Sequence, residues 1–270
     1  KDLVIGTHGQ SIWIMDDTRP LAEWTQETAN APAHLFSIGR ATIFTYWKDT
    51  SYRGQAEFAG ENPVDGAIIT YSLGSGSGEA HLRIARDNGE VVREYLVPNQ
   101  AGMHRVNWDL RHPVADMDGI EPWAPTGQDG LQRNIRNRGH FVSPGTYTVT
   151  LEARGTASST TVVVRGDPEM PLTQAQSEDR EAFLSDIQAL QAEFGEVLGT
   201  GQGSGRRGGQ EGAGMSEEQR NLAQHMRNVG DVYQALNGGG VRQGSLYPPT
   251  TAQRERVEAA RAALREFLRG

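Results

Sequence analysis

The sequence predicts a mainly β protein that ends in helices, and two patterns support this fold class. Between residues 61 and 167, apolar and polar residues alternate in short runs separated by Gly, Pro, Asn and Asp, which is typical of β-strands joined by turns. After residue 167 the apolar residues recur at alternating intervals of four and three, which is typical of amphipathic helices. We therefore expect a β-rich unit followed by a helical unit.

The composition limits the classes of protein to which this chain can belong. Its 270 residues are enough for two or three compact units, and its 33 Gly and 12 Pro suit a loop-rich β protein. The net charge of −8 argues against nucleic acid or an anionic membrane surface as the main partner. The chain has no Cys, which excludes disulfides, thiol catalysis and cysteine-ligated metal sites. No run of about 18 apolar residues occurs, so we expect no membrane-spanning segment.

Residues 1–19 predict a β-hairpin. Leu3–Ile5 and Ser11–Met15 are typical of strands, and His8, Gly9 and Gln10 form the expected turn. Apolar residues stand on both faces, a pattern typical of strands that are buried on both sides. We expect the two strands to pair only with each other and the rest of the chain to cover one face, so that the other apolar face meets solvent.

Residues 20–60 are expected to connect this hairpin to the β-rich unit, with a short helical turn over 20–30 and a strand over 41–46. The β-rich unit is expected to span 61–167. Its first strand alternates Ile69, Tyr71 and Leu73 with Ile68, Thr70 and Ser72, which predicts a half-buried strand. The Asp87–Gly89 segment, with the sequence Asp-Asn-Gly, is the strongest short hairpin signal and predicts a turn between two strands within 81–97.

The second half of this unit continues the alternation. Residues 103–111 predict a strand, 112–142 a long polar loop, and 143–146 a type II turn with Gly145 at positive φ. Residues 159–165 should return beside the strand that follows the turn. The apolar side chains expected to face inward are His104, Val106, Trp108 and Leu110 on one strand and Tyr147, Val149, Leu151 and Ala153 on another. Six or seven short strands within about 110 residues predict an immunoglobulin-like β-sandwich with Trp108 and Tyr147 in its core.

Residues 168–270 predict an antiparallel helical tail. Helices are expected over 173–198 and 216–237, as antiparallel neighbours, and a third is expected from 250; Gly-rich segments at 199–214 and 237–249 connect them. Each expected helix begins with a capping box, formed by Thr173 with Gln176, Ser216 with Gln219, and Thr250 with Gln253. The apolar stripes are Phe183, Ile187, Leu190, Phe194 and Val197; Leu222, Met226, Val229, Tyr233 and Leu236; and Val257, Ala260, Leu264 and Phe267.

The short motifs that could carry chemistry all have a simpler interpretation. Gly203, Gly205 and Gly208 match the letters of a dinucleotide fingerprint, but they follow a helix in low-complexity sequence and predict a linker. Asp116 and Asp118, followed by Gly119, resemble the start of a calcium loop that lacks the bidentate Glu at its twelfth position.

Two other groups have equally simple interpretations. His104 stands on the apolar face of its strand, which favours a hydrogen-bonded core histidine over a ligand. Asp16 and Asp17 close the hairpin, where adjacent carboxylates usually cap a turn or meet solvent, and the sequence shows no third group converging on them. We therefore predict no catalytic, cofactor-binding or metal-binding residue.

The first 17 residues carry a family resemblance that the later segments share. "DLVIGTHGQSIWIMDD" (2–17) resembles the hairpin that ends the propeller in bacterial BNR-repeat, sortilin-type β-propeller proteins. The segments "HLF" (34–36), "GENPVDGAIITYSL" (60–73), "GEVVREY" (89–95), "HRVNWDLR" (104–111), "SPGTYTVTLEARG" (143–155) and "GDPEMP" (166–171) are similar to the same proteins in order and spacing, over about 170 residues. Three of these segments also resemble the immunoglobulin-like domain of flagellar hook-capping proteins, and the helical tail is similar in kind to that seen after this sandwich.

The resemblance implies a secreted or periplasmic protein whose relatives are often labelled glycosyl hydrolases or sialidase-like. It implies the remaining propeller as a partner for residues 1–19, beside a protein, peptide or glycan ligand. We expect a non-catalytic C-terminal portion that acts in binding and assembly. The alternative is the accessory module of a glycoside hydrolase whose active site lies in other blades; a carboxylate pair with glycosidase spacing at the turn of the hairpin would favour it. Whether the whole protein is an enzyme stays open.

Overall fold

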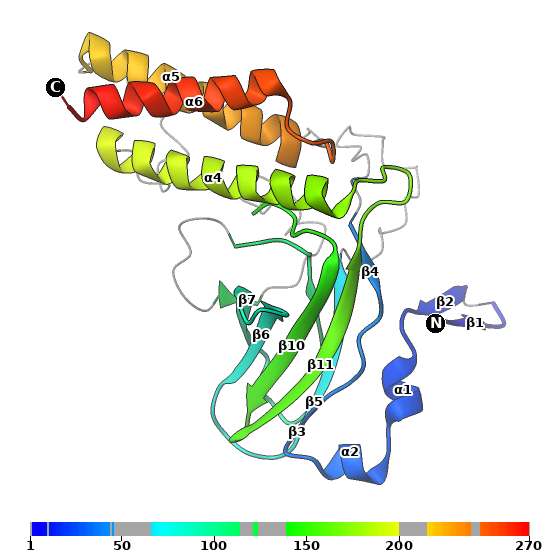
Figure 1. Ribbon diagram of the computed structural model, residues 1–270. Helices are drawn as coiled ribbons and strands as arrows, with labels where there is room; N and C mark the ends of the chain where they lie inside the picture. The colour runs from blue at the N-terminus through cyan, green and yellow to red at the C-terminus, as the bar shows by residue number, and fades with distance from the viewer. Residues whose placement is uncertain are drawn as a thin grey trace.

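The computed structural model describes residues 2–9, 11–43, 45, 66–113, 121–123, 139–199, 215–238 and 244–269. This part of the chain is a mixed β and α structure, as the sequence predicts, with several antiparallel or mixed sheets and five helices (Figure 1). No helix in these ranges combines the length and the apolar character that crossing a membrane requires.

Two sheets form the β-rich unit around one shared hydrophobic core. The larger sheet has the strand order β4-β11-β10-β6-β7-β9, and the smaller has the order β3-β5-β8. Neighbouring strands of the larger sheet are antiparallel, except for the edge pairs β4–β11 and β7–β9, which are parallel. The strands are β3 (Ala33–Leu35), β4 (Ala41–Thr42), β5 (Ala67–Leu73), β6 (Ala80–Arg86), β7 (Val91–Val97), β8 (Gly102–Trp108), β9 (Glu121–Pro122), β10 (Gly145–Ala153) and β11 (Thr156–Arg165).

The core contains the aromatic pair that the sequence predicts. Trp108 and Tyr147 are fully buried and meet edge to face, with ring centroids 5.2 Å apart. The inward-facing side chains of β10 are buried as expected, whereas β5 differs from the prediction: Thr70 and Ser72 are buried as well, so β5 is covered on both faces. Thr70 and Ser72 are small side chains that lie between longer ones on the neighbouring strands, Thr70 beside Arg105 and Ser72 between His34 and Met103.

The turn after β6 is confirmed and the turn before β10 is not. Gly89 has a φ of +84°, and the hairpin is closed by hydrogen bonds between Arg86 and both Gly89 and Glu90. Gly145, in contrast, is already the first residue of β10, is paired with Val164, and does not have positive φ. The carbonyl of Ser143, which would close a type II turn, instead accepts a hydrogen bond of 2.7 Å from the Tyr147 hydroxyl.

The helical unit consists of α4 (Gln174–Leu198), α5 (Glu217–Asn237) and α6 (Thr251–Phe267). All three predicted capping boxes are present. The apolar stripes meet in a second hydrophobic core. In Figure 1 α5 runs antiparallel to both α4 and α6, as expected for 173–198 and 216–237, and α4 lies nearest to the sheets. The glycine fingerprint at 203–208, the motif at 116–119 and nearly all of the 199–214 segment lie outside the described residues.

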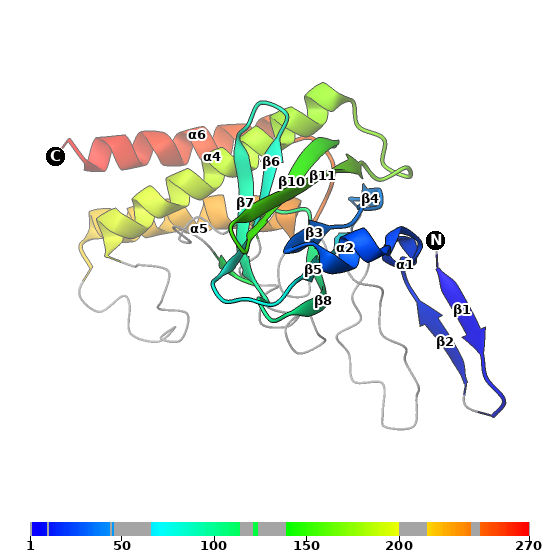
Figure 2. The same ribbon diagram turned by 90° about the horizontal axis from the view of Figure 1, so that it is seen from below.

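The N-terminal hairpin projects away from both units (Figure 2). Its strands β1 (Leu3–Gly6) and β2 (Ile12–Met15) form a separate two-stranded sheet, as the sequence predicts, and the short helices α1 (Arg19–Glu23) and α2 (Gln26–Asn30) follow. The expectation that one face is covered is wrong. Seven apolar side chains on both faces are between 40 % and 69 % exposed, namely Leu3, Val4, Ile5, Ile12, Trp13, Ile14 and Met15. The hairpin points away from the other sheets, so no other described element covers its two faces (Figure 2).

Candidate functional site

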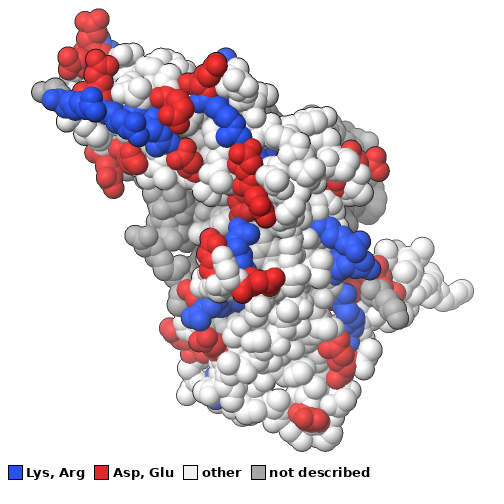
Figure 3. Space-filling model, viewed as in Figure 1, with Lys and Arg blue, Asp and Glu red and all other residues white. Residues whose placement is uncertain are grey.

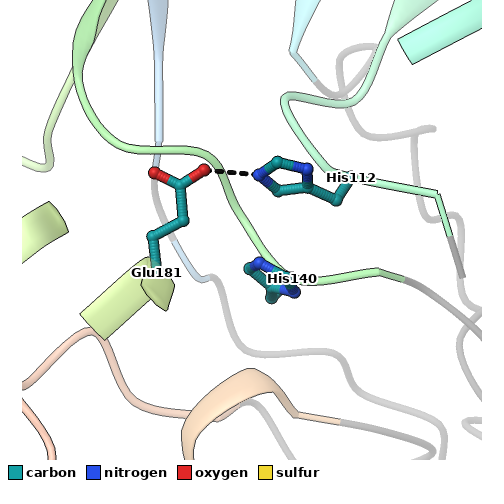
Figure 4. Close-up of side chains that lie close together, drawn as sticks. All are labelled: His112, His140 and Glu181. Carbon is teal, nitrogen blue, oxygen red and sulfur yellow. Dashed lines mark hydrogen bonds and ion pairs between the residues drawn. The ribbon is translucent and has the colours of Figure 1, made fainter. Parts of the chain in front are cut away.

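Two histidines and a glutamate meet where helix α4 crosses the end of the sheets (Figure 4). His112 follows β8, His140 precedes β10, and Glu181 lies in the second turn of α4. A short antiparallel contact aligns the two histidine segments, because the amide of His112 donates to the carbonyl of His140 over 2.9 Å. Gly139 permits this approach: a Cβ there would stand 1.9 Å from the carbonyl oxygen of His112.

The Glu181 carboxylate accepts four hydrogen bonds although its side chain is only 9 % exposed. One oxygen accepts the amide (2.9 Å) and the hydroxyl (2.6 Å) of Ser143. The other oxygen is bonded to Nε2 of His112 and to a guanidinium nitrogen of Arg86. Burial raises the pKa of this carboxyl, but the hydrogen bonds from His112 and Ser143 outweigh burial and lower it to about 2. Glu181 is therefore an ionised, fully occupied acceptor.

His140 is buried and bonded at both ring nitrogens. Its Nδ1 lies 2.8 Å from Oε1 of Gln188 and its Nε2 lies 3.0 Å from the hydroxyl of Ser185, both on α4. The ring stacks on His112 with centroids 4.6 Å apart. Burial lowers the pKa of the His140 imidazole to about 3, and the neighbouring His112 acts in the same direction. His140 is thus neutral at pH 7, with one nitrogen donating to Gln188 and the other accepting from Ser185.

The donor set resembles a metal centre in residue type, but its hydrogen bonds do not fit one. The three potential ligand atoms lie within 4.8 Å of one another, and two His with one Glu can ligate zinc. The Arg86 guanidinium, however, occupies the same Glu181 oxygen that His112 contacts, and His140 has no free nitrogen. A divalent cation would have to displace a bound cation. A carboxyl with a pKa of about 2 is also a poor general base at pH 7. The cluster is suited to joining α4 to the sheets.

A pocket of about 290 Å³ lies beside this cluster, along the first turns of α4. Most of its wall is apolar and includes Phe141, Val142, Leu172 and Leu246. The charged residue that contributes to it from α4 is Arg180, which is 5 % exposed. Arg180 donates from Nη2 to the carbonyls of Leu236 and Ser245, each over 3.0 Å. Burial lowers the pKa of its guanidinium to about 10, so it is charged at neutral pH.

The residues that the sequence singled out do not belong to this cluster. Asp17 is buried at the base of the hairpin and pairs with Nε of Arg19 over 2.7 Å, while Asp16 is exposed. His104 is hydrogen bonded as predicted, to the carbonyl of Gln100 over 2.7 Å, but it is only partly buried and stacks on Tyr71 at the edge of the core. The carboxylates of Asp2 and Asp17 accept main-chain amides at the base of the hairpin, those of Asp17 and Arg19 respectively, each over 3.2 Å. Asp17 therefore closes the hairpin, as the sequence predicts.

Nothing in the sequence pattern singled out His112 and His140, but α4 carries a usable signal for Arg180 and Glu181. Glu181, Ser185 and Gln188 repeat at the same four-three interval as the apolar stripe, which marks a second, polar face of one helix. Arg180 stands at a stripe position itself, three residues before Phe183. A helix with two such faces must contact a second surface as well as the neighbouring helices.

The fold and this site define a mixed β and α protein whose two hydrophobic cores are joined through buried charges. We compared the chain with protein-family models, curated proteins and solved structures, and none of them matches it.

Proposed function

We propose that this chain is the non-catalytic C-terminal portion of an exported β-propeller protein and acts in binding and assembly. The observation that carries the proposal is the N-terminal hairpin, whose seven apolar side chains are exposed on both faces. Burying one such side chain contributes roughly 1.5–3 kcal/mol. A two-stranded hairpin is at best marginally stable by itself. Neighbouring propeller strands would cover both faces and pair with both edges.

The surface of the hairpin is uncharged and apolar, which suits contact with a protein better than contact with a charged ligand. Residues 3–15 contain no Asp, Glu, Lys or Arg, and the hairpin is a projection without blue or red atoms in Figure 3. Over the helices in the same view, positive and negative side chains lie interspersed (Figure 3). An apolar patch of this kind marks an interaction surface.

Three features favour an immunoglobulin-like assignment for the β-rich unit within this proposal. Two sheets enclose one core, and a fully buried Trp108 lies at its centre. The Tyr147 hydroxyl donates to the carbonyl of Ser143 four residues upstream, which resembles the tyrosine corner of immunoglobulin-like folds. The alternative of a glycoside hydrolase module calls for carboxylates at the turn of the hairpin, and the described turn residues Thr7, His8, Gly9 and Ser11 supply none.

Deletion of residues 2–15 tests the assembly role of the hairpin. Sedimentation should show that the full chain self-associates and that the shortened chain is monomeric, because the exposed apolar strands are removed. The Tm should stay nearly unchanged, since the contacts of Asp16 with Arg105 and of Asp17 with Arg19 remain, and the deletion removes the single hydrogen bond between Asp2 and Asp17 at the base. The control is Val163→Ser, which removes a 39 % exposed apolar side chain from β11 and should leave self-association as it is. Loss of the sheet structure on deletion would contradict the proposal.

Hydrogen exchange tests the propeller partner. In the 270-residue chain, the amides of β1 and β2 that point away from the hairpin should exchange within seconds. In the protein secreted by its own cell they should be protected, because propeller strands would pair with these edges. Equally fast exchange in both preparations would count against a propeller.

A further inference from the structure

We propose that the pocket beside α4 binds a small monocarboxylate with an apolar body, and that Arg180 receives the carboxylate. The proposal rests on the ligand-binding part of the proposed function and does not depend on the hairpin.

The guanidinium of Arg180 is incompletely paired. Its Nη2 is bonded to two main-chain carbonyls, and its Nε is enclosed by protein without a hydrogen-bond partner, so Nη1 is the nitrogen left to meet a ligand in the pocket. No carboxylate within the described ranges forms an ion pair with this guanidinium. The adjacent Glu181 directs its carboxylate to Arg86, His112 and Ser143 instead. A guanidinium that is 5 % exposed and lacks an anionic partner is strongly disfavoured unless an anion completes it.

The wall of the pocket is mostly apolar. Phe141, Val142, Leu172 and Leu246 supply apolar surface next to Arg180. The neighbouring polar side chains already have partners: Ser177 donates to the carbonyl of Thr173, and Gln174 donates to the carbonyl of Pro144. Arg180 is thus the polar group of this wall that still has donor capacity. A ligand that suits the site has one anionic end and an otherwise apolar surface.

The volume of the pocket and the charge of its wall limit the size and the charge of the ligand. A volume of about 290 Å³ corresponds to roughly ten water molecules at ~30 Å³ each, and hence to a ligand of about ten non-hydrogen atoms. Octanoate and 3-phenylpropanoate are of this size. Asp167 also contributes to the wall, and its carboxylate accepts the amide of Glu169 over 2.9 Å. Its negative charge disfavours phosphates and other dianions, which leaves a monocarboxylate as the best match.

Calorimetric titration of the full chain tests the proposal. Octanoate and 3-phenylpropanoate are the two probes, and their relative affinities distinguish a fatty acid from an aromatic acid. We expect at least one to bind at a single site, and 1-octanol and octylamine to bind at least tenfold more weakly. Arg180→Gln should weaken acid binding at least tenfold. The matched control is Arg254→Gln, which changes an exposed guanidinium on α6 that pairs with Asp179 and should leave the affinity unchanged.

Two further variants keep the test decisive if Arg180→Gln does not fold. Leu172→Trp fills the pocket without altering a charge and should abolish binding. Asp167→Asn removes the opposing charge and should tighten acid binding about two- to threefold. The proposal is overturned if neither acid binds, if octanol binds as tightly as octanoate, or if Leu172→Trp leaves binding unchanged. Failure here leaves the self-association of the hairpin unaffected, so the two proposals can fail separately.

Discussion

Glu181 shows how a single carboxylate can be kept ionised away from solvent. Burial alone would favour the neutral acid, but the four hydrogen bonds from Ser143, His112 and Arg86 reverse that preference. The same bonds connect α4 to residues that precede it by 38, 69 and 95 positions. One side chain thus links three separate segments of the β-rich unit to the helices.

Glu181→Gln should lower the free energy of unfolding by about 3 kcal/mol at pH 7, because it leaves the buried donors without their anion. Urea denaturation measures the change. The matched control is Glu90→Gln, which removes the exposed partner of the same Arg86 guanidinium, 3.4 Å away, and should change stability by less than about 0.5 kcal/mol. Equal effects of the two substitutions would show that the buried network contributes nothing beyond a surface ion pair.

At the scale of elements, the features that the sequence predicts correctly are those that short-range interactions determine. The capping boxes join residues three positions apart, and the Asp-Asn-Gly turn needs only its own backbone preferences, so both are confirmed. The type II turn at 143–146 is wrong because Gly145 lies in β10, where pairing with Val164 of the later strand β11 holds it extended and without the positive φ that the turn requires. The candidate site could not be predicted in the same way, since its histidines flank a long segment and its glutamate lies on a later helix.

Gly139→Ala tests how closely the two histidine segments must approach. The added Cβ would stand 1.9 Å from the carbonyl oxygen of His112 and 2.7 Å from that of Pro113. We expect a loss of about 2–3 kcal/mol in the free energy of unfolding, because backbone atoms cannot move aside as a flexible side chain can. Hydrogen exchange should show faster exchange of the His112 amide, which donates to His140.

Gly145→Ala is the control for this substitution, because a Cβ at Gly145 would meet only a ring carbon of Tyr147, 3.8 Å away. Its stability should stay within about 0.5 kcal/mol of the original chain. A Gly139→Ala variant as stable as this control would mean that the segments can separate without consequence.

At the scale of the whole molecule, polar contacts join two separate hydrophobic cores. The sheets enclose one core and the three helices enclose the other. Glu181 and His140 connect α4 to the sheets, and the side chain of Asn237 at the end of α5 accepts from Arg111 over 2.8 Å. Hydrogen bonds and charges respond to pH far more than apolar packing does, so the joint should be the acid-sensitive part of the molecule.

His140 should make this joint sensitive to mild acid. Its pKa of about 3 in the folded chain lies below the value of about 6.5 expected when unfolded. At a pH between these two pKa values, the unfolded chain binds a proton at His140 that the folded chain excludes. The contribution of His140 to the free energy of unfolding therefore falls by about 1.4 kcal/mol for each unit of decreasing pH. Glu181 acts in the same direction only below about pH 4.5, since its folded pKa is about 2. The window from pH 6.5 to 4.5 therefore separates the effect of His140 from that of Glu181.

Urea denaturation of the original chain and of His140→Gln across this window measures the effect. The original chain should lose about 2–3 kcal/mol more than the variant between pH 6.5 and 4.5, and the two should show parallel pH dependence from pH 7 to 8. Near pH 4.5 the helices should separate from the sheets first, because His140 binds a proton only once separation opens its ring to solvent, and the protonated imidazole can no longer accept from Ser185. Tyrosine and tryptophan signals from the sheet core should then change at higher urea than the helical circular dichroism signal. Parallel pH profiles throughout would show that His140 is not excluded from protonation by its place between α4 and the sheets.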